Sequence, residues 1–174
     1  CADFNRAKMA SDIENVPFDA IHDVDILLVG ATDVGIALSN AIAASESLGL
    51  GVVPIGGIRR QPLEVIELLQ LPQYVIPIAG LCIGYGIDDP GLNPRLPKET
   101  FVHKEEYNIN QEKFIQSYNE VFKEHQLIKS NGQNNSTWTN RISSFYNGTH
   151  YNNNYKDVPQ MLKQQGFNCK DILE

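Results

Sequence analysis

The hydrophobic residues of this chain are concentrated in one long segment, residues 26–46, which carries a single charged side chain, Asp33, before its final glutamate. Its abundance of Ala, Leu and Ile favours an α-helix. Apolar residues occupy two different sides of that helix: Leu27, Val34, Leu38 and Ala41 on one, and Ile26, Val29, Ile36 and Ala43 on another. A helix that lacks a polar face is typical of a buried position, so we expect this helix to be buried on all sides at the centre of the fold.

Glycines mark both the inside and the end of the predicted helix. Gly30 and Gly35 weaken a helix but let a neighbouring backbone approach closely, and the Leu-Gly-Leu-Gly sequence of residues 48–51 predicts its C-terminal stop. A membrane span is the alternative, because about 20 apolar residues are enough to cross a bilayer. Asp33, the scattered Ser and Asn side chains and the lack of a basic flank favour a core helix shared with a second subunit.

Shorter patterns predict the elements on either side of the central helix. Residues 1–21 begin like the end of a strand and continue as a polar connection with room for a short helix. Residues 51–60 combine β-branched residues with proline and paired glycines, which predicts a short strand followed by a tight turn. Residues 61–69 predict a helix with proline in its first turn. The apolar run of residues 74–84 predicts a buried strand with Pro77 at its start or edge.

The C-terminal half is more polar and is divided by a proline-rich loop. Residues 86–97 contain three prolines and two glycines, which predicts a loop with a fixed backbone. Residues 101–103 indicate a short extended segment, and residues 110–126 have aromatic side chains at helical spacing. Further short helices are expected at residues 138–146 and 158–165, the second closed by Gly166.

Composition indicates an ordinary globular protein. The 174 residues suit one domain, and 42% apolar with 20% charged residues is a typical balance. A net charge of −7 argues against a general nucleic-acid binder. Cys1, Cys82 and Cys169 have no metal-ligand spacing, and Cys82 lies in an apolar run, so we expect a buried thiol there and a reduced, cytoplasmic protein. Because the chain begins at Cys1, we also expect an N-terminal portion outside this sequence.

The paired glycines are the strongest local candidate for binding chemistry. Gly56 and Gly57 let backbone N–H groups approach a flat or anionic ligand, and Arg59 and Arg60 beside them suit a phosphate or carboxylate. The alternative is a tight turn with solvated arginines. Arg95, in the proline-fixed loop, is a second candidate for a phosphate, with a surface ion pair as its alternative.

Side-chain catalysis and metal binding find little support in the sequence. The four histidines are dispersed without metal-ligand spacing. The sequence contains neither the Gly-x-Ser-x-Gly nucleophile elbow nor a phosphate-binding P-loop. We therefore expect no metal and no catalytic side chain.

Several short segments together resemble a known family, the FMN-dependent nitroreductase superfamily, in its branch of NADPH-dependent flavin and nitro reductases. The segments that carry the resemblance are Ala43-Ala44-Ser45-Glu46-Ser47-Leu48-Gly49-Leu50-Gly51, Ile55-Gly56-Gly57-Ile58-Arg59, Leu71-Pro72, Gly80-Leu81-Cys82-Ile83-Gly84, Pro94-Arg95-Leu96-Pro97, His103, and Cys1-Ala2-Asp3-Phe4-Asn5-Arg6. Each segment alone is common, but the combination covers nearly the whole chain and is specific.

The resemblance implies an α+β fold, a mixed sheet around a long buried central helix. Residues 1–174 would form the C-terminal two-thirds of a single nitroreductase-like domain. Two subunits would pack through the helix into an obligate homodimer with FMN at the interface, and C-terminal segments would reach over the partner. The protein would be cytoplasmic, with no membrane and no nucleic acid as partner.

The resemblance also implies roles for individual residues. The backbone of Ile55, Gly56 and Gly57, preceded by Pro54, would lie against the flavin ring. Arg95 would bind the FMN phosphate, and Asn93 stands where many relatives have a lysine for the same phosphate. Lys129 would help to hold the NADPH phosphate. The neighbouring Asn134 and Asn135 are uncharged, so the choice between NADPH and NADH stays open.

The implied activity is a two-step hydride transfer from NADPH or NADH, through FMN, to a nitroaromatic compound, a quinone or free flavin. The cofactor carries the redox chemistry and the protein positions it, which agrees with the lack of a catalytic side-chain triad. The family's His-x-Ser-x-Arg phosphate-binding motif is not in these residues. The alternative is therefore a truncated, non-catalytic relative that dimerises or binds flavin weakly.

Overall fold

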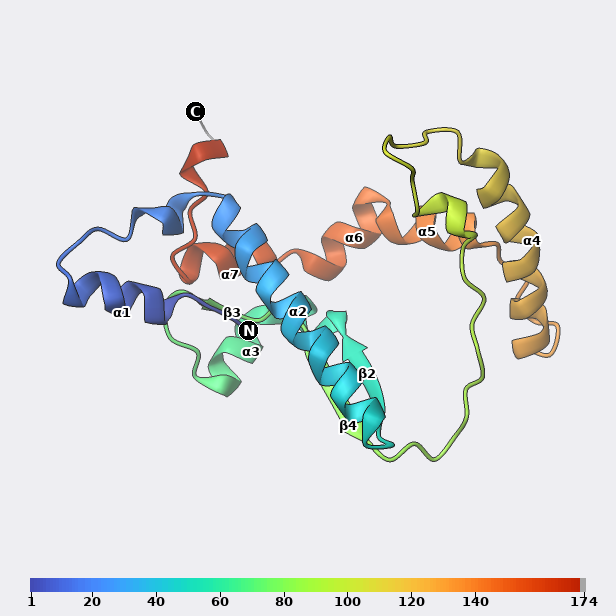
Figure 1. Ribbon diagram of the computed structural model, residues 1–174, viewed down its shortest axis with the longest axis horizontal. Helices are drawn as coiled ribbons and strands as arrows, with labels where there is room; N and C mark the ends of the chain where they lie inside the picture. The colour runs from blue at the N-terminus through green and yellow to red at the C-terminus, as the bar shows by residue number, and fades with distance from the viewer. Residues whose placement is uncertain (173–174) are drawn as a thin grey trace. The chain divides into compact units, whose positions relative to one another are not determined.

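The computed structural model describes residues 1–172, which form two compact units (Figure 1). Unit 1 contains residues 1–87 together with the C-terminal segment from residue 154, and unit 2 contains residues 88–153. The elements of unit 1 are β1 (Ala2–Asp3), α1 (Asn5–Ile13), a 3-10 helix (Asp19–His22), α2 (Asp25–Ser47), β2 (Gly51–Ile55), a 3-10 helix (Gly56–Arg60), α3 (Pro62–Leu69), β3 (Val75–Ile76), β4 (Gly80–Gly84), α7 (Val158–Gln164) and a 3-10 helix (Lys170–Ile172).

Unit 2 is built from helices around the proline-rich loop. Its elements are a 3-10 helix (Lys98–Thr100), α4 (Glu112–Lys129), α5 (Trp138–Tyr146) and most of α6 (Gly148–Tyr155). α5 begins with a capping box, because the Thr137 side chain accepts a hydrogen bond from the Asn140 N–H and the Asn140 side chain accepts one from the Thr137 N–H. The helices predicted at residues 110–126 and 138–146 are confirmed as α4 and α5.

The core of unit 1 joins the two ends of the chain. β1 pairs antiparallel with β3, with Ala2 opposite Ile76. Both residues are buried together with Ile21, Met161 and Phe167, so α7 near the C-terminus packs against the first strand. The backbone N–H of Tyr74 donates to the Gln165 carbonyl at 3.1 Å and fixes the end of α7 to the start of β3. Gly166 closes this helix with a φ of +88°, as the sequence predicts.

The predicted strand over residues 74–84 is wrong as a single buried element. Pro77 interrupts it, because proline cannot donate to a ladder, and the run forms two strands in different sheets. β3 pairs with β1, whereas β4 pairs with β2 in an antiparallel ribbon with Gly80 opposite Ile55. β2 and β4 form a sheet of two strands, so each is paired along one edge only, and Cys82 is exposed rather than buried.

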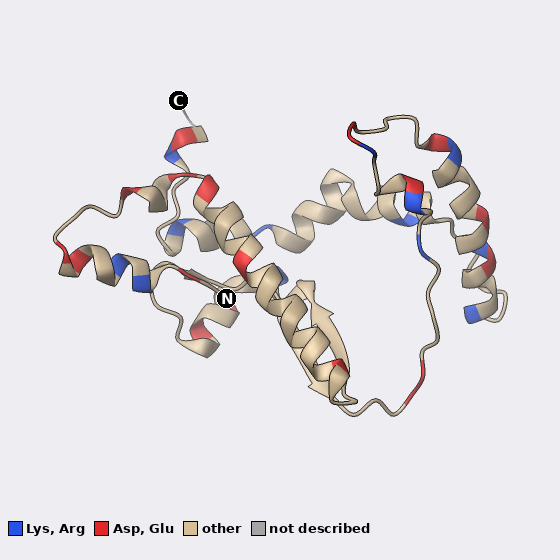
Figure 2. Ribbon diagram, in the orientation of Figure 1, with Lys and Arg blue, Asp and Glu red and all other residues tan. Residues whose placement is uncertain are grey.

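The long helix α2 is confirmed, but the described chain alone does not bury it. Only Gly30 and Ser45 are buried among its residues, while Leu28 and Ile36 are 63% and 58% exposed. Figure 2 shows long uncharged stretches on α2 between its acidic residues. Among residues 1–172, α2 is the one helix long and apolar enough to span a membrane by length and composition. The apolar sides of α2 therefore find little cover in the described chain.

Two predicted roles of glycine are confirmed, the close approach of a neighbouring backbone at Gly30 in α2 and the helix stop at Gly49 just after it. A Cβ on Gly30 would lie 2.8 Å from the Phe4 ring and 2.9 Å from the Ala2 side chain, so Gly30 allows β1 to approach closely. Gly49 has a φ of +74° just after the helix. The Leu50 N–H donates to the Ser45 carbonyl at 3.0 Å, which completes a Schellman-type stop.

Two further predictions differ from the structure. Residues 1–21 contain a full helix, α1, immediately after β1, where the sequence indicated mainly a connection. Residues 101–103, where the sequence indicated an extended segment, form no strand: Phe101 lies in a turn directly after the 3-10 helix of unit 2.

Candidate functional site

The turn at Gly56–Arg60, here called the double-glycine turn, follows directly from β2 in unit 1. β2 pairs with β4 up to its last residue, Ile55, which lies opposite Gly80. The chain then enters a 3-10 helix whose first two residues are Gly56 and Gly57. The predicted short strand and tight turn are confirmed at this place.

Open space lies above both glycines of this turn. An added Cβ at Gly56 or Gly57 would meet no atom of the described chain within 4 Å. Neither residue is among the described glycines with positive φ, so neither backbone requires glycine for its dihedral angles. Because side chains are absent and the approach is unobstructed, a flat ligand can reach the backbone at van der Waals distance.

The two arginines of the turn have different surroundings. Arg59 is half-buried, its guanidinium donates to the Ile78 carbonyl, and it lies 5.9 Å from the centroid of the Tyr155 ring. Arg60 is exposed. The Arg59 guanidinium thus has a partner within the fold, and the hypothesis that Arg59 and Arg60 contact a phosphate or carboxylate stays a prediction.

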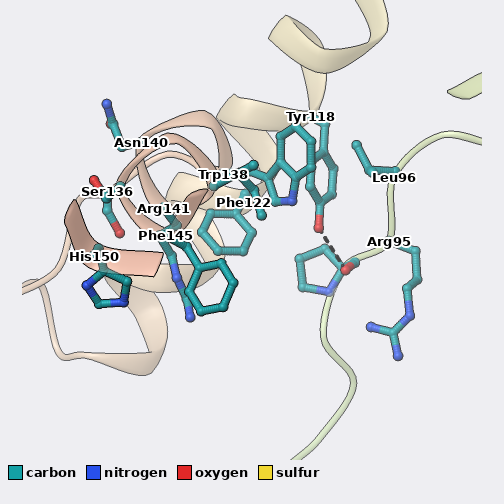
Figure 3. A pocket seen from close by; sticks show the side chains of 13 residues that line it. Arg95, Leu96, Tyr118, Phe122, Ser136, Trp138, Asn140, Arg141, Phe145 and His150 are labelled. Carbon is teal, nitrogen blue, oxygen red and sulfur yellow. Dashed lines mark hydrogen bonds between the residues drawn. The ribbon is translucent and has the colours of Figure 1, made fainter. Parts of the chain in front are cut away.

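In unit 2, the loop that carries Arg95 is fastened to α4. The Tyr118 hydroxyl donates a hydrogen bond of 2.9 Å to the Pro94 carbonyl, as Figure 3 shows. Burial raises the pKa of the Tyr118 hydroxyl, and the positive charge of Arg95 acts in the opposite direction. The helical spacing of Tyr118 with Phe114 and Phe122 predicts only a packing role for this ring, not the hydrogen bond of its hydroxyl.

An aromatic cluster lines a cavity of about 800 Å³ behind this loop. The Tyr118 ring lies 6.0 Å from Trp138 and 5.9 Å from Phe122, and the Arg141 guanidinium lies 5.6 Å from the Phe122 ring. In Figure 3 the Arg95 side chain points away from these rings. The Trp138 ring thus packs within unit 2.

The remaining predicted site residues lie on the surface of unit 2. Arg95 and Asn93 are both exposed, and Arg95 donates to the Asn93 carbonyl at 3.0 Å, so the backbone of one predicted phosphate residue orients the other. Lys129 is exposed in the last turn of α4, where a positive charge also complements the helix dipole. Asn134 anchors the following loop through its N–H, which donates to the Ser130 hydroxyl at 2.7 Å.

The structure thus groups the predicted site residues by unit. Pro54, Ile55, Gly56 and Gly57 form one continuous strip in unit 1, with Pro54 opposite Leu81 in the ribbon. Asn93 and Arg95 form a second group in unit 2. Among residues 1–172, no cluster of His, Cys, Asp or Glu is placed to hold a metal ion.

Comparison with known proteins identifies the family. The family model described as "Nitroreductase family" matches residues 14–85, and the family model described as "Nitroreductase family, C-terminal domain" matches residues 93–170. An FMN reductase (NAD(P)H) of Bacillus subtilis is 44% identical over 171 residues, which cover 96% of this chain and 67% of the relative. This chain belongs to the nitroreductase family. The suspected superfamily is therefore confirmed, and with it the branch whose members use NADPH, flavin or nitro compounds.

Other members of the nitroreductase family support the fold. An oxygen-insensitive NADPH nitroreductase of Salmonella typhimurium is 41% identical over 82% of this chain and 57% of its own length. The solved structure of Bacillus megaterium NfrA2 has a TM-score of 0.91 at 46% identity, over 96% of this chain and 66% of that protein. The α+β nitroreductase fold is thus confirmed for the aligned part. The chain spans between about half and two-thirds of the length of these relatives.

Proposed function

We propose that this protein is an FMN-dependent oxidoreductase that transfers hydride from NAD(P)H to nitroaromatics, quinones or free flavin. The observation that carries the proposal is the unobstructed double-glycine turn in a chain of the nitroreductase family. Relatives with the names FMN reductase and NADPH nitroreductase favour this function over a non-catalytic relative.

The strip from Pro54 to Gly57 suits the flavin ring. Side chains are absent at Gly56 and Gly57, and the space above them is open, so the backbone itself forms the surface offered to a planar group. Bound FMN would supply the capacity to accept a hydride from NAD(P)H and to pass it to the acceptor. Backbone N–H groups in this strip would donate hydrogen bonds to the polar edge of the ring and favour negative charge there.

Arg95 and Asn93 suit the phosphate of the cofactor. The Arg95 guanidinium has five N–H donors, and its bond to the Asn93 carbonyl uses one nitrogen. The remaining donors can form charge-assisted hydrogen bonds with phosphate oxygens. Asn93 offers an amide without charge, so Arg95 supplies the positive charge of this pair of residues.

Lys129 is the proposed contact for the NAD(P)H phosphate. Its ammonium group is exposed at the end of α4 and is followed by a loop with the neutral residues Asn134 and Asn135. A single charge of this kind gives a modest preference for NADPH, because one screened contact contributes little at a surface.

The exposed sides of α2 support a homodimer. A helix of 23 residues with mostly apolar side chains needs cover, and a second copy of the chain can provide it across a two-fold axis. Solved family members and the absence of basic residues beside the helix favour this cover over a lipid bilayer. The protein would accordingly be soluble and cytoplasmic.

The decisive experiment is an absorption spectrum of the purified protein with and without NADPH. We expect a yellow protein whose flavin absorbance bleaches with NADPH and returns when a quinone or nitroaromatic compound is added. Protein that stays colourless and takes up no added FMN would contradict the proposal.

The proposed dimer is tested separately by light scattering after size-exclusion chromatography. Ile36→Glu places a charge on the exposed face of α2 and should shift the mass from two chains toward one. Ile13→Glu, at a similarly exposed position on α1, is the matched control and should leave the mass unchanged. An unmodified protein with the mass of one chain would exclude the homodimer.

A further inference from the structure

We propose that Arg59 is a positioning residue that holds the double-glycine turn in the shape that receives the flavin ring. The inference rests on the proposed function, because it concerns the same strip of backbone. It assigns a role to a side chain whose described contacts, the Ile78 carbonyl and the Tyr155 ring, both lie within unit 1. The side chain acts through the fixed ends of the turn.

The turn is held on both sides of its glycines. On the N-terminal side, Ile55 pairs with Gly80 in the β2–β4 ribbon. On the C-terminal side, the Arg59 guanidinium donates to the Ile78 carbonyl, two residues before Gly80. Gly56 and Gly57 therefore lie between two attachments to the same short segment of chain.

Close packing beneath the turn agrees with this arrangement. A Cβ on Gly80 would lie 3.4 Å from the Ile55 side chain and 3.6 Å from the end of Ile58, so the turn lies directly over Gly80. Glycines themselves supply no packing and leave the backbone free to move. The rigidity of this strip must come from its neighbours, and Arg59 provides the one charged contact among them that the structure describes.

The Arg59 side chain also contacts the C-terminal part of unit 1. Its guanidinium lies 5.9 Å from the Tyr155 ring centroid, within the range of a cation–π interaction. A planar guanidinium can donate in its plane and stack through its face at the same time, which an ammonium group cannot do. Arginine is therefore better suited than lysine to join the Ile78 carbonyl and the Tyr155 ring.

Three variants of the protein test the inference. Arg59→Met removes the charge and the donors, Arg59→Lys keeps the charge and one donor, and Arg6→Met is the matched control at an exposed arginine of α1. FMN is added to flavin-free protein, and binding is followed by quenching of flavin fluorescence. Visible circular dichroism of bound FMN reports the surroundings of the ring, and thermal melting reports the fold.

We expect Arg59→Met to raise the FMN dissociation constant about tenfold and to change the visible circular dichroism, since a lost hydrogen bond to a charged group has an effect of this size. Arg59→Lys should fall between Arg59→Met and the unmodified protein. Arg6→Met should stay within about twofold with an unchanged spectrum.

The inference is overturned if Arg59→Met and Arg59→Lys bind FMN with the spectrum and affinity of the control. If Arg59→Met does not fold, Arg59→Lys decides, because an unchanged spectrum in that variant also overturns the inference. Failure of the unmodified protein to bind FMN would instead refute the proposed function, and the role of Arg59 with it. The two failures are distinguished by the unmodified protein alone.

Discussion

The hydroxyl of Tyr118 donates a hydrogen bond of 2.9 Å to the carbonyl oxygen of Pro94, the residue immediately before Arg95. The two partners are 24 positions apart in the sequence, so the bond ties a loop without regular structure to the long helix α4. The Tyr118 ring is itself packed against Trp138 and Phe122. The position of Arg95 therefore depends on an aromatic cluster that carries no charge of its own at neutral pH.

Removal of this hydroxyl should loosen the Arg95 loop. Tyr118→Phe keeps the ring but leaves the Pro94 carbonyl without its donor, which should cost about 1 kcal/mol of stability and weaken FMN binding several-fold. Chemical unfolding and FMN titration measure the two effects. Tyr85→Phe, at a side chain that is 87% exposed, is the control and should change neither quantity. Equal FMN affinity in both variants would show that the loop does not need this bond.

The same hydroxyl predicts a loss of stability at high pH. Burial raises the pKa of Tyr118 in the folded protein, with a smaller opposing effect from Arg95, so the fold favours the protonated phenol. Its contribution is complete below the ordinary pKa of tyrosine and is lost as pH rises through the higher, folded value. The urea midpoint should fall more steeply above about pH 10 in the unmodified protein than in Tyr118→Phe.

Arg95→Gln provides an independent check of this titration. Removal of the guanidinium charge should raise the pKa of Tyr118 further, because the effect that opposes burial is gone. The ultraviolet absorbance of tyrosinate, taken as the difference from the same variant with Tyr118→Phe, follows this group alone. A pKa that moves downward would show that the Arg95 charge does not act on the phenol.

A side chain added at the double-glycine turn should weaken FMN binding without lowering the stability of the fold. Gly57→Val adds atoms where nothing lies within 4 Å, so the melting temperature should change little. The FMN dissociation constant should rise at least about tenfold, because the added methyl groups occupy the surface offered to the ring. Gly84→Val, at the end of β4 with equally open space, is the control and should bind FMN normally. Unchanged affinity in Gly57→Val would place the ring elsewhere.

Alanine substitutions at two glycines of α2 should change the stability of the protein in opposite directions. Gly30→Ala forces a methyl group to within 3 Å of Phe4 and Ala2 and should cost about 1–3 kcal/mol. Gly35→Ala meets nothing within 4 Å in this chain and should gain up to about 1 kcal/mol from helix propensity. Thermal unfolding of both variants distinguishes these effects. Destabilisation by Gly35→Ala would indicate that another surface lies against that side of the helix.

Local patterns predicted most elements because they report backbone preference directly. The helix of residues 26–46, the glycine stop after it and the turn at residues 56–60 all follow from residue types that restrict φ and ψ or lack a side chain. Pro77 shows the limit of such patterns. Its effect on a ladder was expected, but which strand pairs with which partner depends on contacts between β1 and β3 and between β2 and β4.

Burial and side-chain roles were less accessible from sequence, since they depend on distant partners. Cys82 lies in an apolar run and was expected to be buried, yet the ribbon leaves it exposed. For Arg59 the sequence left a ligand contact and a solvated turn as alternatives, because nothing nearby in sequence shows that Ile78 would accept its hydrogen bond. Tyr118 was expected only to pack, since a phenol on a helical stripe gives no sign of the carbonyl at Pro94.

The open sides of α2 have a consequence for how the protein is handled at the bench and made in the cell. If a second copy covers this helix, as proposed, then folding is coupled to association and obeys mass action. Dilution would lower the melting temperature, and a low rate of synthesis would leave more chains exposed to proteases than a high one. Abundance would thus become a determinant of survival for each newly made chain.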